Sequence, residues 1–238
     1  MNYIILAAGM GTRLHPYTKN FPKCMVQIGF GETVIQRTVR LIRDNDPGAH
    51  VVVVTGFKRT DVELGLEGCT FINNPFFGKT NSIASLWFAR DYLGDDVTII
   101  NGDIVMSEKL FLFIRNTDIR ASVFVDSSIK KDGDYNVQVI GERVVVMSKQ
   151  LDAYYGEYAG VTKLDSHSAQ LLRTEVCRMI DEGASEEWYE NALVQMILNA
   201  EFLLRYTDIS DFDWTEIDSV NHILVARKIQ QMECSAKP

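Results

Sequence analysis

The sequence predicts an α/β fold in which helices flank a mixed, mostly parallel sheet. In the first half of the chain, short apolar runs that are typical of buried strands alternate with segments that have the apolar spacing of helices. Such alternation favours a parallel sheet with crossover helices. The 238 residues, 46% of them hydrophobic, are enough for one large core. Because no repeat, low-complexity tract or linker interrupts them, we expect a single domain over residues 1–238.

The first half of the chain supplies the alternating elements. Residues 32–45 carry apolar side chains at helical spacing, and Asp46-Pro47-Gly48 ends this helix. Asn81 or Thr80 is a suitable N-cap for a later helix. In chain order, we expect strands at residues 3–8, 50–55, 69–73 and 97–101, and helices at residues 32–45 and 58–66 and after Asn81.

The second half combines helices with antiparallel signals. Gly141-Glu142-Arg143 separates two β-rich stretches, residues 136–140 and 144–147, which predicts a hairpin. Residues 127–135 are polar and predict a mobile loop. The other expected elements are helices at residues 107–116, 167–182 and 187–199, a strand at 121–126, a last strand at 202–207 and a terminal helix ending near Gln230.

Composition narrows the classes of function. The absence of both an apolar run of about eighteen residues and a signal peptide predicts a cytoplasmic protein without a membrane span. Four scattered cysteines without a C-x-x-C pair are typical of reduced thiols. A net charge of −8 argues against a nucleic-acid partner. Residues 1–43 nevertheless hold six Lys or Arg against one acid. This excess fits a local anion site, although Arg37, Arg40 and Arg43 could also be a solvated helix face.

The first strand leads into a glycine-rich turn followed by basic residues. Gly9 and Gly11 let the backbone present its N–H groups to a ligand, while Arg13 and Lys23 supply positive charge suited to phosphate oxygens. A polyphosphate site is the direct chemical interpretation, and an ordinary turn is the alternative. The dinucleotide pattern G-x-G-x-x-G fails because Leu14 stands where its last glycine belongs. The Walker A pattern ending at Gly78-Lys79-Thr80 fails in the same way at Asn73.

As a whole, residues 6–14 (LAAGMGTRL) with Pro22-Lys23 resemble the signature of the nucleotidylyltransferases that activate sugar phosphates and related alcohol phosphates. This resemblance implies a Rossmann-like fold of the nucleotide-diphospho-sugar transferase type. It also implies transfer of a nucleotidyl group to a phosphorylated acceptor, with release of pyrophosphate. The residues that it places at the nucleotide are Leu6, Ala7, Ala8, Gly9, Gly11, Thr12, Arg13, Lys23, Asn81, Ser82 and Gly102.

The stretch Thr80-Asn81-Ser82-x-x-Ser85-Leu86 resembles the phosphocholine cytidylyltransferase-like branch of that family. In the family this segment lies against the base, so the resemblance makes Asn81 and Ser82 candidate base contacts and CTP the expected nucleotide. Plain helix capping is the alternative for these residues.

Two acidic segments resemble the family's metal-binding motifs. Gly102-Asp103 follows a predicted parallel strand, and Trp214-x-Glu216-x-Asp218 precedes the terminal helix. The resemblance implies that Asp103 and Asp218, with Glu216, hold Mg²⁺, an ion that prefers oxygen ligands. An Asp turn and a solvated acidic loop are the alternatives. His222 departs from the family, which commonly has an acid there, and is expected to be structural.

The resemblance also indicates which residues contact the acceptor. Lys149 is a candidate for its phosphate, although Ser148-Lys149-Gln150 departs from the family's E-K-P, so a surface lysine is an equal alternative. Tyr158 and Gly160 belong to a stretch that borders the acceptor in the family. Six aromatic residues could surround a quaternary ammonium group. The alternative is that they belong to the core. They are Tyr154, Tyr155, Tyr158, Trp188, Tyr189 and Trp214.

The expected catalytic residues are Lys23 on the α-phosphate, Arg13 on the β- and γ-phosphates, and the metal ligands Asp103 and Asp218. The expected partners are CTP and a small phosphorylated or phosphonate acceptor, and the sequence leaves open whether the protein is a homo-oligomer. Two alternatives remain: a sugar-1-phosphate uridylyl- or thymidylyltransferase of the same fold, and a non-catalytic nucleotide-binding module.

Overall fold

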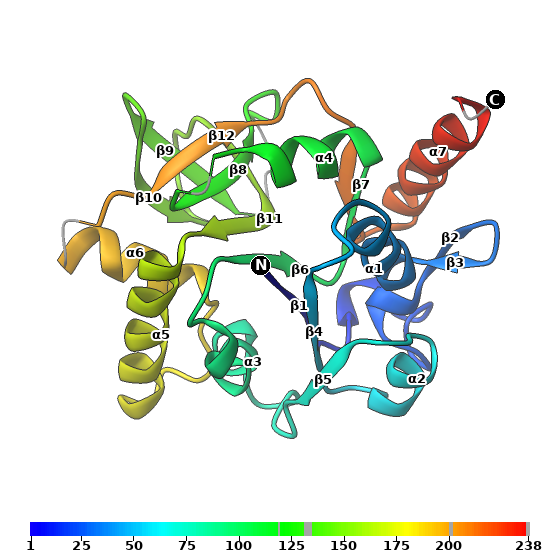
Figure 1. Ribbon diagram of the computed structural model, residues 1–238, viewed down its shortest axis with the longest axis horizontal. Helices are drawn as coiled ribbons and strands as arrows, with labels where there is room; N and C mark the ends of the chain where they lie inside the picture. Colours follow the sequence, from blue (N-terminus) through cyan, green and yellow to red (C-terminus); the bar gives the residue numbers. More distant parts are fainter. Residues whose placement is uncertain (119, 131–134, 200–201, 237–238) are drawn as a thin grey trace.

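The structure is a computed structural model that describes residues 1–118, 120–130, 135–199 and 202–236 (Figure 1). Within these residues, a sheet of nine strands has the order β5-β4-β1-β6-β11-β8-β12-β10-β9. The strands are β1 Asn2–Ala7, β4 His50–Thr55, β5 Thr70–Asn73, β6 Val97–Asn101, β8 Ser122–Asp126, β9 Asn136–Ile140, β10 Arg143–Ser148, β11 Gly156–Leu164 and β12 Arg205–Asp208. The predicted α/β class is confirmed.

The first four strands in this order, β5, β4, β1 and β6, run parallel. Their register aligns Leu6 of β1 with Val54 of β4 and with Asn101 of β6. The carboxyl ends of these strands therefore meet at one edge of the sheet, where open α/β sheets bind ligands. On the other side of β6, β11 pairs antiparallel with both β6 and β8, so the sheet is mixed.

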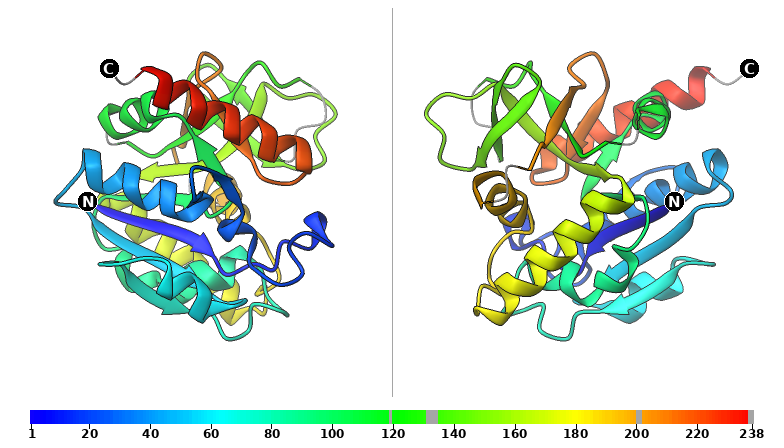
Figure 2. Two further views of the ribbon diagram at one scale, coloured as in Figure 1. Left: turned by 90° about the vertical axis from the view of Figure 1, so that its right-hand side faces the viewer. Right: turned by 60° about the vertical axis from the view of Figure 1, so that its left-hand side comes forward.

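Helices cover both faces of the sheet (Figures 1 and 2). Ile4 of β1 packs in a core with residues of α3, α5 and α6, whereas Tyr3 and Ile5 pack in a second core with residues of α1 and α4. This division follows from the period of two along a strand. The helices are α1 Val34–Asn45, α2 Arg59–Leu64, α3 Ser82–Phe88, α4 Glu108–Asn116, α5 Ser166–Asp181, α6 Glu190–Asn199 and α7 Val220–Ala236, with 3₁₀ turns η1 Thr12–Leu14, η2 Lys23–Met25 and η3 Arg90–Tyr92. None of the described helices has both the length and the apolar character needed to cross a membrane.

Several predicted boundaries are wrong. The strand expected at residues 202–207 begins only at Arg205, and it is not the last, because β13 (Trp214–Glu216) follows and pairs with β7 (Ile104–Met106). The terminal helix does not end near Gln230 but continues to Ala236. Part of the loop expected at 127–135, residues 131–134, lies outside the described residues. Short strands such as β13 have no sequence signal of their own, because they are stabilised by a partner distant in the chain.

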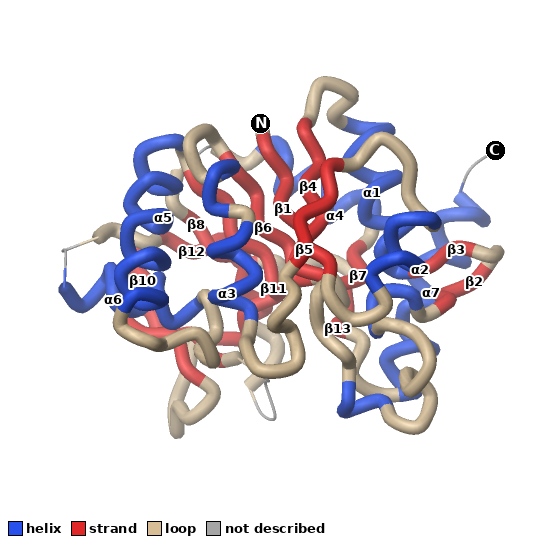
Figure 3. Tube along the Cα trace, turned by 90° about the horizontal axis from the view of Figure 1, so that it is seen from below, coloured by secondary structure: helices blue, strands red, loops and turns tan. Residues whose placement is uncertain are grey.

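A third core joins the two ends of the chain. Leu14, Val26 and Val34 from the N-terminal segment pack with Ile217, Ala226 and Ile229 from the C-terminal segment. The hairpin of β2 (Gln27–Gly29) and β3 (Glu32–Thr33), which the sequence did not predict, lies against α7. Figure 3 shows β7, β13, α7 and this hairpin on the same side of the molecule. The packing brings the residues that precede α7 close to the N-terminal basic segment.

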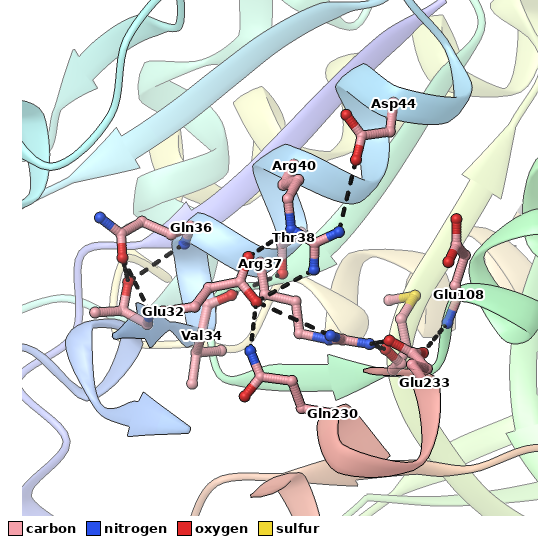
Figure 4. Close-up of polar contacts among 12 residues, drawn as sticks. Glu32, Val34, Gln36, Arg37, Thr38, Arg40, Asp44, Glu108, Gln230 and Glu233 are labelled. Carbon is pink, nitrogen blue, oxygen red and sulfur yellow. Dashed lines mark hydrogen bonds and ion pairs between the residues drawn. The ribbon is translucent and has the colours of Figure 1, made fainter. Parts of the chain in front are cut away.

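Arg37 of α1 reinforces this contact (Figure 4). Its side chain is 1% exposed, donates to the Met106 carbonyl at the end of β7 and forms an ion pair of 2.7 Å with Glu233 of α7. Glu233 also accepts a hydrogen bond from the backbone N–H of Glu108, at 2.6 Å. For Arg37, the alternative of a solvated helix face is therefore wrong, because its guanidinium group is buried and donates to the Met106 carbonyl and to Glu233.

Candidate active site

A cavity of about 340 Å³ opens at the carboxyl ends of β1 and β6. It extends along the sheet edge from the loop after β1, past Asp103, to β11 and the start of α6. All the predicted site residues except Asp218 line it: Leu6, Ala7, Ala8, Gly9, Gly11, Thr12, Arg13, Lys23, Asn81, Ser82, Gly102, Asp103, Lys149, Tyr158, Gly160 and Glu216. Asp218 lies beside the cavity, in contact with Lys23 and Arg13.

The glycine turn is shaped to admit Lys23. Gly11 has a φ of +65°, and a Cβ atom at this position would lie 2.6 Å from the Cβ of Lys23. The hydroxyl of Thr18 donates to the Gly11 carbonyl at 2.7 Å and holds the turn in place. Lys23 itself lies in η2 and is only 8% exposed. A side chain larger than hydrogen at Gly11 would therefore displace the lysine from the cavity wall.

Three acids from the middle and the C-terminal part of the chain meet beside this lysine. Asp103, Glu216 and Asp218 each offer a carboxylate oxygen, and these oxygens lie within 4.8 Å of one another. The pairing of β7 with β13 brings the segments together, and the N–H of Ile217 donates to the Asp103 carbonyl at 3.0 Å. His222 of α7 accepts the N–H of Asp218 on Nδ1 at 3.2 Å, so it positions the backbone of this acid.

Two positively charged side chains, Lys23 and Arg13, contact this cluster of acids. Lys23 Nζ is 2.7 Å from an oxygen of Asp103 and also contacts Asp218, and Arg13 is 2.6 Å from the second oxygen of Asp218. Burial by itself would lower the pKa of Lys23, but the carboxylates of Asp103, Glu216 and Asp218 raise it to about 12. Lys23 therefore stays charged. Because a cation already occupies this group of oxygen donors, the donor set also fits a divalent ion such as Mg²⁺.

The predicted base-contact segment has a structural role as well. Asn81 caps α3 by accepting the N–H of Ser82 at 2.8 Å, which is the capping alternative considered for this residue. Ser82 Oγ accepts the N–H of Tyr189 at 2.8 Å and so ties α3 to the segment before α6. Both residues still line the cavity. Ser85, which belongs to the same motif but was given no role, lines the cavity beside them, as do Asn74 and Phe77, which the sequence did not single out.

At the other end of the cavity, β11 and α6 supply the walls. Gly160 of β11 has a φ of +69° at an irregularity in the pairing with β8, and a Cβ there would lie 2.8 Å from the side chain of Ile104. Lys149 Nζ stacks over the Trp188 ring at 4.3 Å. Tyr135 and Glu190 also line this end, and the sequence did not single them out. No local motif marks either residue, since both enter the site through tertiary packing.

The aromatic residues considered for an ammonium site divide into two groups. Tyr158 and Trp188 line the cavity. Tyr189 is fully buried in the core, Tyr155 donates to Asp208 at 2.8 Å, and the indole N–H of Trp214 donates to Asp126 at 2.8 Å. For these three, the alternative of a structural role holds. Tyr154 does not line the cavity either, and its buried hydroxyl has no hydrogen-bond partner among the described residues.

Comparison with known proteins agrees with this geometry. The choline-phosphate cytidylyltransferase of Haemophilus influenzae is 33% identical over 114 residues, which are 47% of this chain and 48% of that protein, so the match spans about half of each. The CTP:phosphoglutamine cytidylyltransferase of Campylobacter jejuni is 25% identical over 94% of this chain and 98% of its own length. These relatives confirm the predicted resemblance to the phosphocholine cytidylyltransferase-like branch.

Solved structures share the fold. A CTP:phosphocholine cytidylyltransferase from Streptococcus pneumoniae matches with a TM-score of 0.79 and 23% identity, covering 98% of both chains. An inositol-1-phosphate CTP transferase from T. maritima matches with a TM-score of 0.75 and 18% identity, covering 97% of this chain and 96% of that one. The family model described as a MobA-like NTP transferase domain matches residues 3–126. The chain therefore belongs to the MobA-like NTP transferase family.

Proposed function

We propose that this protein is a CTP-dependent cytidylyltransferase that joins CMP to a small, phosphocholine-like phosphorylated or phosphonate acceptor and releases pyrophosphate. The observation that carries the proposal is the meeting of Asp103, Glu216 and Asp218 with Lys23 and Arg13 beside one cavity. A module that only bound a nucleotide would not need acids gathered from two distant segments of the chain. The relatives named for cytidylyl transfer support the choice of CTP.

The nucleotide occupies the β1 end of the cavity in this proposal. The N–H groups after β1, with Gly9, Gly11 and Thr12, face the triphosphate, and Gly102 allows close approach. Asn81 and Ser82, which line the same end, contact the base. Lys23 binds the α-phosphate, and Arg13 binds the β- and γ-phosphates, since the guanidinium fork suits two oxygens at once. The whole chain, residues 1–238, acts as one nucleotidyltransferase domain.

Asp103, Asp218 and Glu216 would hold Mg²⁺. When bound, the ion neutralises charge on the phosphate oxygens that become crowded during transfer. The protein's own cations must then leave the acids, because Lys23 and Arg13 already contact them. We propose that the triphosphate draws both side chains toward its oxygens, so that binding of the nucleotide also frees the carboxylates.

The nucleophile is the acceptor's own phosphate or phosphonate oxygen, which attacks the α-phosphorus in line with the departing pyrophosphate. With a second pKa of about 6, a phosphate monoester is largely ionised at neutral pH, so no general base is required. Catalysis consists of positioning the two substrates and neutralising their charges. Lys149, Tyr158 and Gly160 line the end of the cavity that receives the acceptor.

Pyrophosphate release from a panel of nucleotides tests the proposal. CTP, UTP, dTTP, ATP and GTP are each incubated with Mg²⁺ and with choline phosphate, ethanolamine phosphate, aminoethylphosphonate, a phosphorylated amino acid or glucose 1-phosphate. Release that requires both CTP and a small non-sugar acceptor is the expected result. Turnover only with UTP or dTTP and a sugar phosphate would contradict the proposal, as would the absence of release from every pair.

A further inference from the structure

The largest fully buried side chain among the described residues is charged. It belongs to Arg37 of α1, which is 1% exposed. Its Nε and Nη2 atoms donate to the Met106 carbonyl at 3.2 and 3.0 Å, and Nη2 lies 2.7 Å from the Glu233 carboxylate. Its Nη1 atom is 4.0 Å from an oxygen of Glu32. Because charges lose hydration on burial, an apolar pair of similar volume is often as stable as a buried ion pair or more stable. Stability alone therefore does not explain the pair of Arg37 and Glu233.

Arg37 and Glu233 hold one short junction of the chain (Figure 4). Met106 ends β7 and Glu108 begins α4, so a single residue separates the two elements. Arg37 donates to the carbonyl of Met106, and Glu233 accepts the backbone N–H of Glu108 at 2.6 Å. Residues 106–108 are therefore attached to α1 and α7 at the same time.

This junction is close in the chain to one of the acids of the site. Asp103 directly precedes β7, which has only three residues. β7 pairs with β13, and the hydrogen bonds run from one end of the pair to the other. The N–H of Ser107 donates to the carbonyl of Asp213 at 2.9 Å, and the N–H of Ile217 donates to the carbonyl of Asp103 at 3.0 Å. The position of the junction therefore determines the position of Asp103.

α7 determines the position of the second acid. Asp218 lies two residues before the first residue of α7, and its backbone N–H is bonded to His222 in the first turn. Near the other end of the helix, Glu233 pairs with Arg37. The apolar contacts of the third core also hold α7, but such contacts are not directional. The planar guanidinium fork is directional, so it fixes the direction in which α7 leaves the site.

We infer that Arg37 and Glu233 are positioning residues of the active site. By fixing α7 on the junction between β7 and α4, they set the separation of Asp218 from Asp103. Neither Arg37 nor Glu233 lines the cavity, so both act only through these acids. The inference rests on the proposed function, because it assumes that Asp103 and Asp218 hold a divalent ion together.

The double variant Arg37→Met/Glu233→Met tests the pair. It removes both charges and keeps unbranched side chains, whereas a single substitution would leave the other charge without its counter-charge. We expect the double variant to fold, which urea denaturation checks. Arg40→Met is the matched control, because Arg40 lies one turn further along α1 and its ion partners are Glu32 and Asp44. Arg37→Lys keeps the charge without the planar fork.

The effect of Mg²⁺ on nucleotide affinity measures how well the acids hold the ion. Calorimetry gives the Kd of a non-hydrolysable CTP analogue in EDTA and at saturating Mg²⁺. The ratio of the first Kd to the second removes any change that is common to both. We expect this ratio to be the same in the wild-type protein and Arg40→Met. In the double variant it should fall by about tenfold, as for residues that orient metal ligands. Arg37→Lys should give an intermediate value.

An unchanged ratio in the folded double variant would overturn the inference, because a purely structural loss weakens binding equally with and without the ion. A ratio near one in the wild-type protein would overturn it as well. If the double variant does not fold, the ratio of Arg37→Lys decides in the same way.

The result does not depend on turnover. A lower ratio in the double variant supports the inference even if no pyrophosphate is released, in which case only the proposed reaction fails. Turnover with CTP together with an unchanged ratio would overturn the inference alone and leave the proposed function in place.

Discussion

Charged side chains are paired differently at the two ends of the cavity. At the end that we propose for the nucleotide, the acids Asp103 and Asp218 contact the cations Lys23 and Arg13, so opposite charges lie side by side. At the acceptor end, Glu190 is buried with one oxygen that no described residue satisfies. At the first end, ion pairs between side chains can hold the geometry, and contacts with a substrate can replace these ion pairs. The second end buries a carboxylate that the described residues satisfy only in part.

The largest effects are expected at the nucleotide end. Asp103→Ala and Lys23→Ala should each lower turnover by about two orders of magnitude or more, because each removes a charge that stabilises the crowded phosphates. Steady-state pyrophosphate release measures the rate, and circular dichroism checks that the protein stays folded. Asp95→Asn, an exposed acid away from the cavity, is the control. Rates near the wild-type value in either variant would remove that residue from the catalytic assignment.

An intermediate effect is expected from the turn that admits Lys23. Gly11→Ala should lower kcat/KM for CTP by about tenfold to a hundredfold, because the added Cβ would lie 2.6 Å from the Lys23 side chain and shift it. The strain of a left-handed alanine costs about 1–2 kcal/mol in addition.

The variant Gly31→Ala measures the effect of backbone strain alone. Gly31 has a φ of +75°, but no atom of the described residues lies within 4 Å of the place that a Cβ would take. The substitution should therefore destabilise the protein similarly while leaving turnover intact. Chemical denaturation and pyrophosphate release are measured on both variants. Similar losses of turnover in the two would mean that backbone strain, and not the position of Lys23, explains the effect of Gly11→Ala.

The smallest effect concerns stability at the acceptor end. The folded-state pKa of Glu190, about 7, is higher than that of an ordinary carboxyl group, so its stabilising contribution is complete below about pH 4.5 and is lost as the pH rises through 7. Relative to Glu190→Gln, the free energy of unfolding of the wild-type protein should fall by about 1 kcal/mol between pH 6 and pH 7. Urea denaturation of the ligand-free proteins at these two pH values measures the difference. The structure indicates that Glu190 is desolvated. An equal change of the free energy of unfolding with pH in the two proteins would contradict this.

The same contrast explains which parts of the site the sequence could predict. At the nucleotide end, Gly9, Gly11, Arg13 and Lys23 lie within one short segment, so their types and spacing carry a local signal. Asp103 and Asp218 are far apart, but each belongs to a motif that resembles the family. At the other end, Tyr135 precedes β9 and Glu190 begins α6, so they share the wall only through tertiary contacts such as the hydrogen bond from Tyr135 to Asn191, and neither belongs to a motif.

The fold shows a similar division. Strands β1, β4 and β6 are predictable because they are buried apolar runs, whereas β13 is not, because its pairing with β7 stabilises it. The sequence places the end of α7 too early, and the continuation of this helix carries Glu233, which pairs with the buried Arg37. Local patterns predict elements that bury a continuous apolar face. They do not predict elements that depend on a specific distant partner.

The most direct test of the account is a crystal structure with a non-hydrolysable CTP analogue and Mg²⁺. We expect Asp103 and Asp218 to share one ion, with the Lys23 ammonium group moved from these acids to the α-phosphate and Arg13 to the terminal phosphates. An empty glycine turn, or an ion bound elsewhere while Lys23 remains between Asp103 and Asp218, would contradict it.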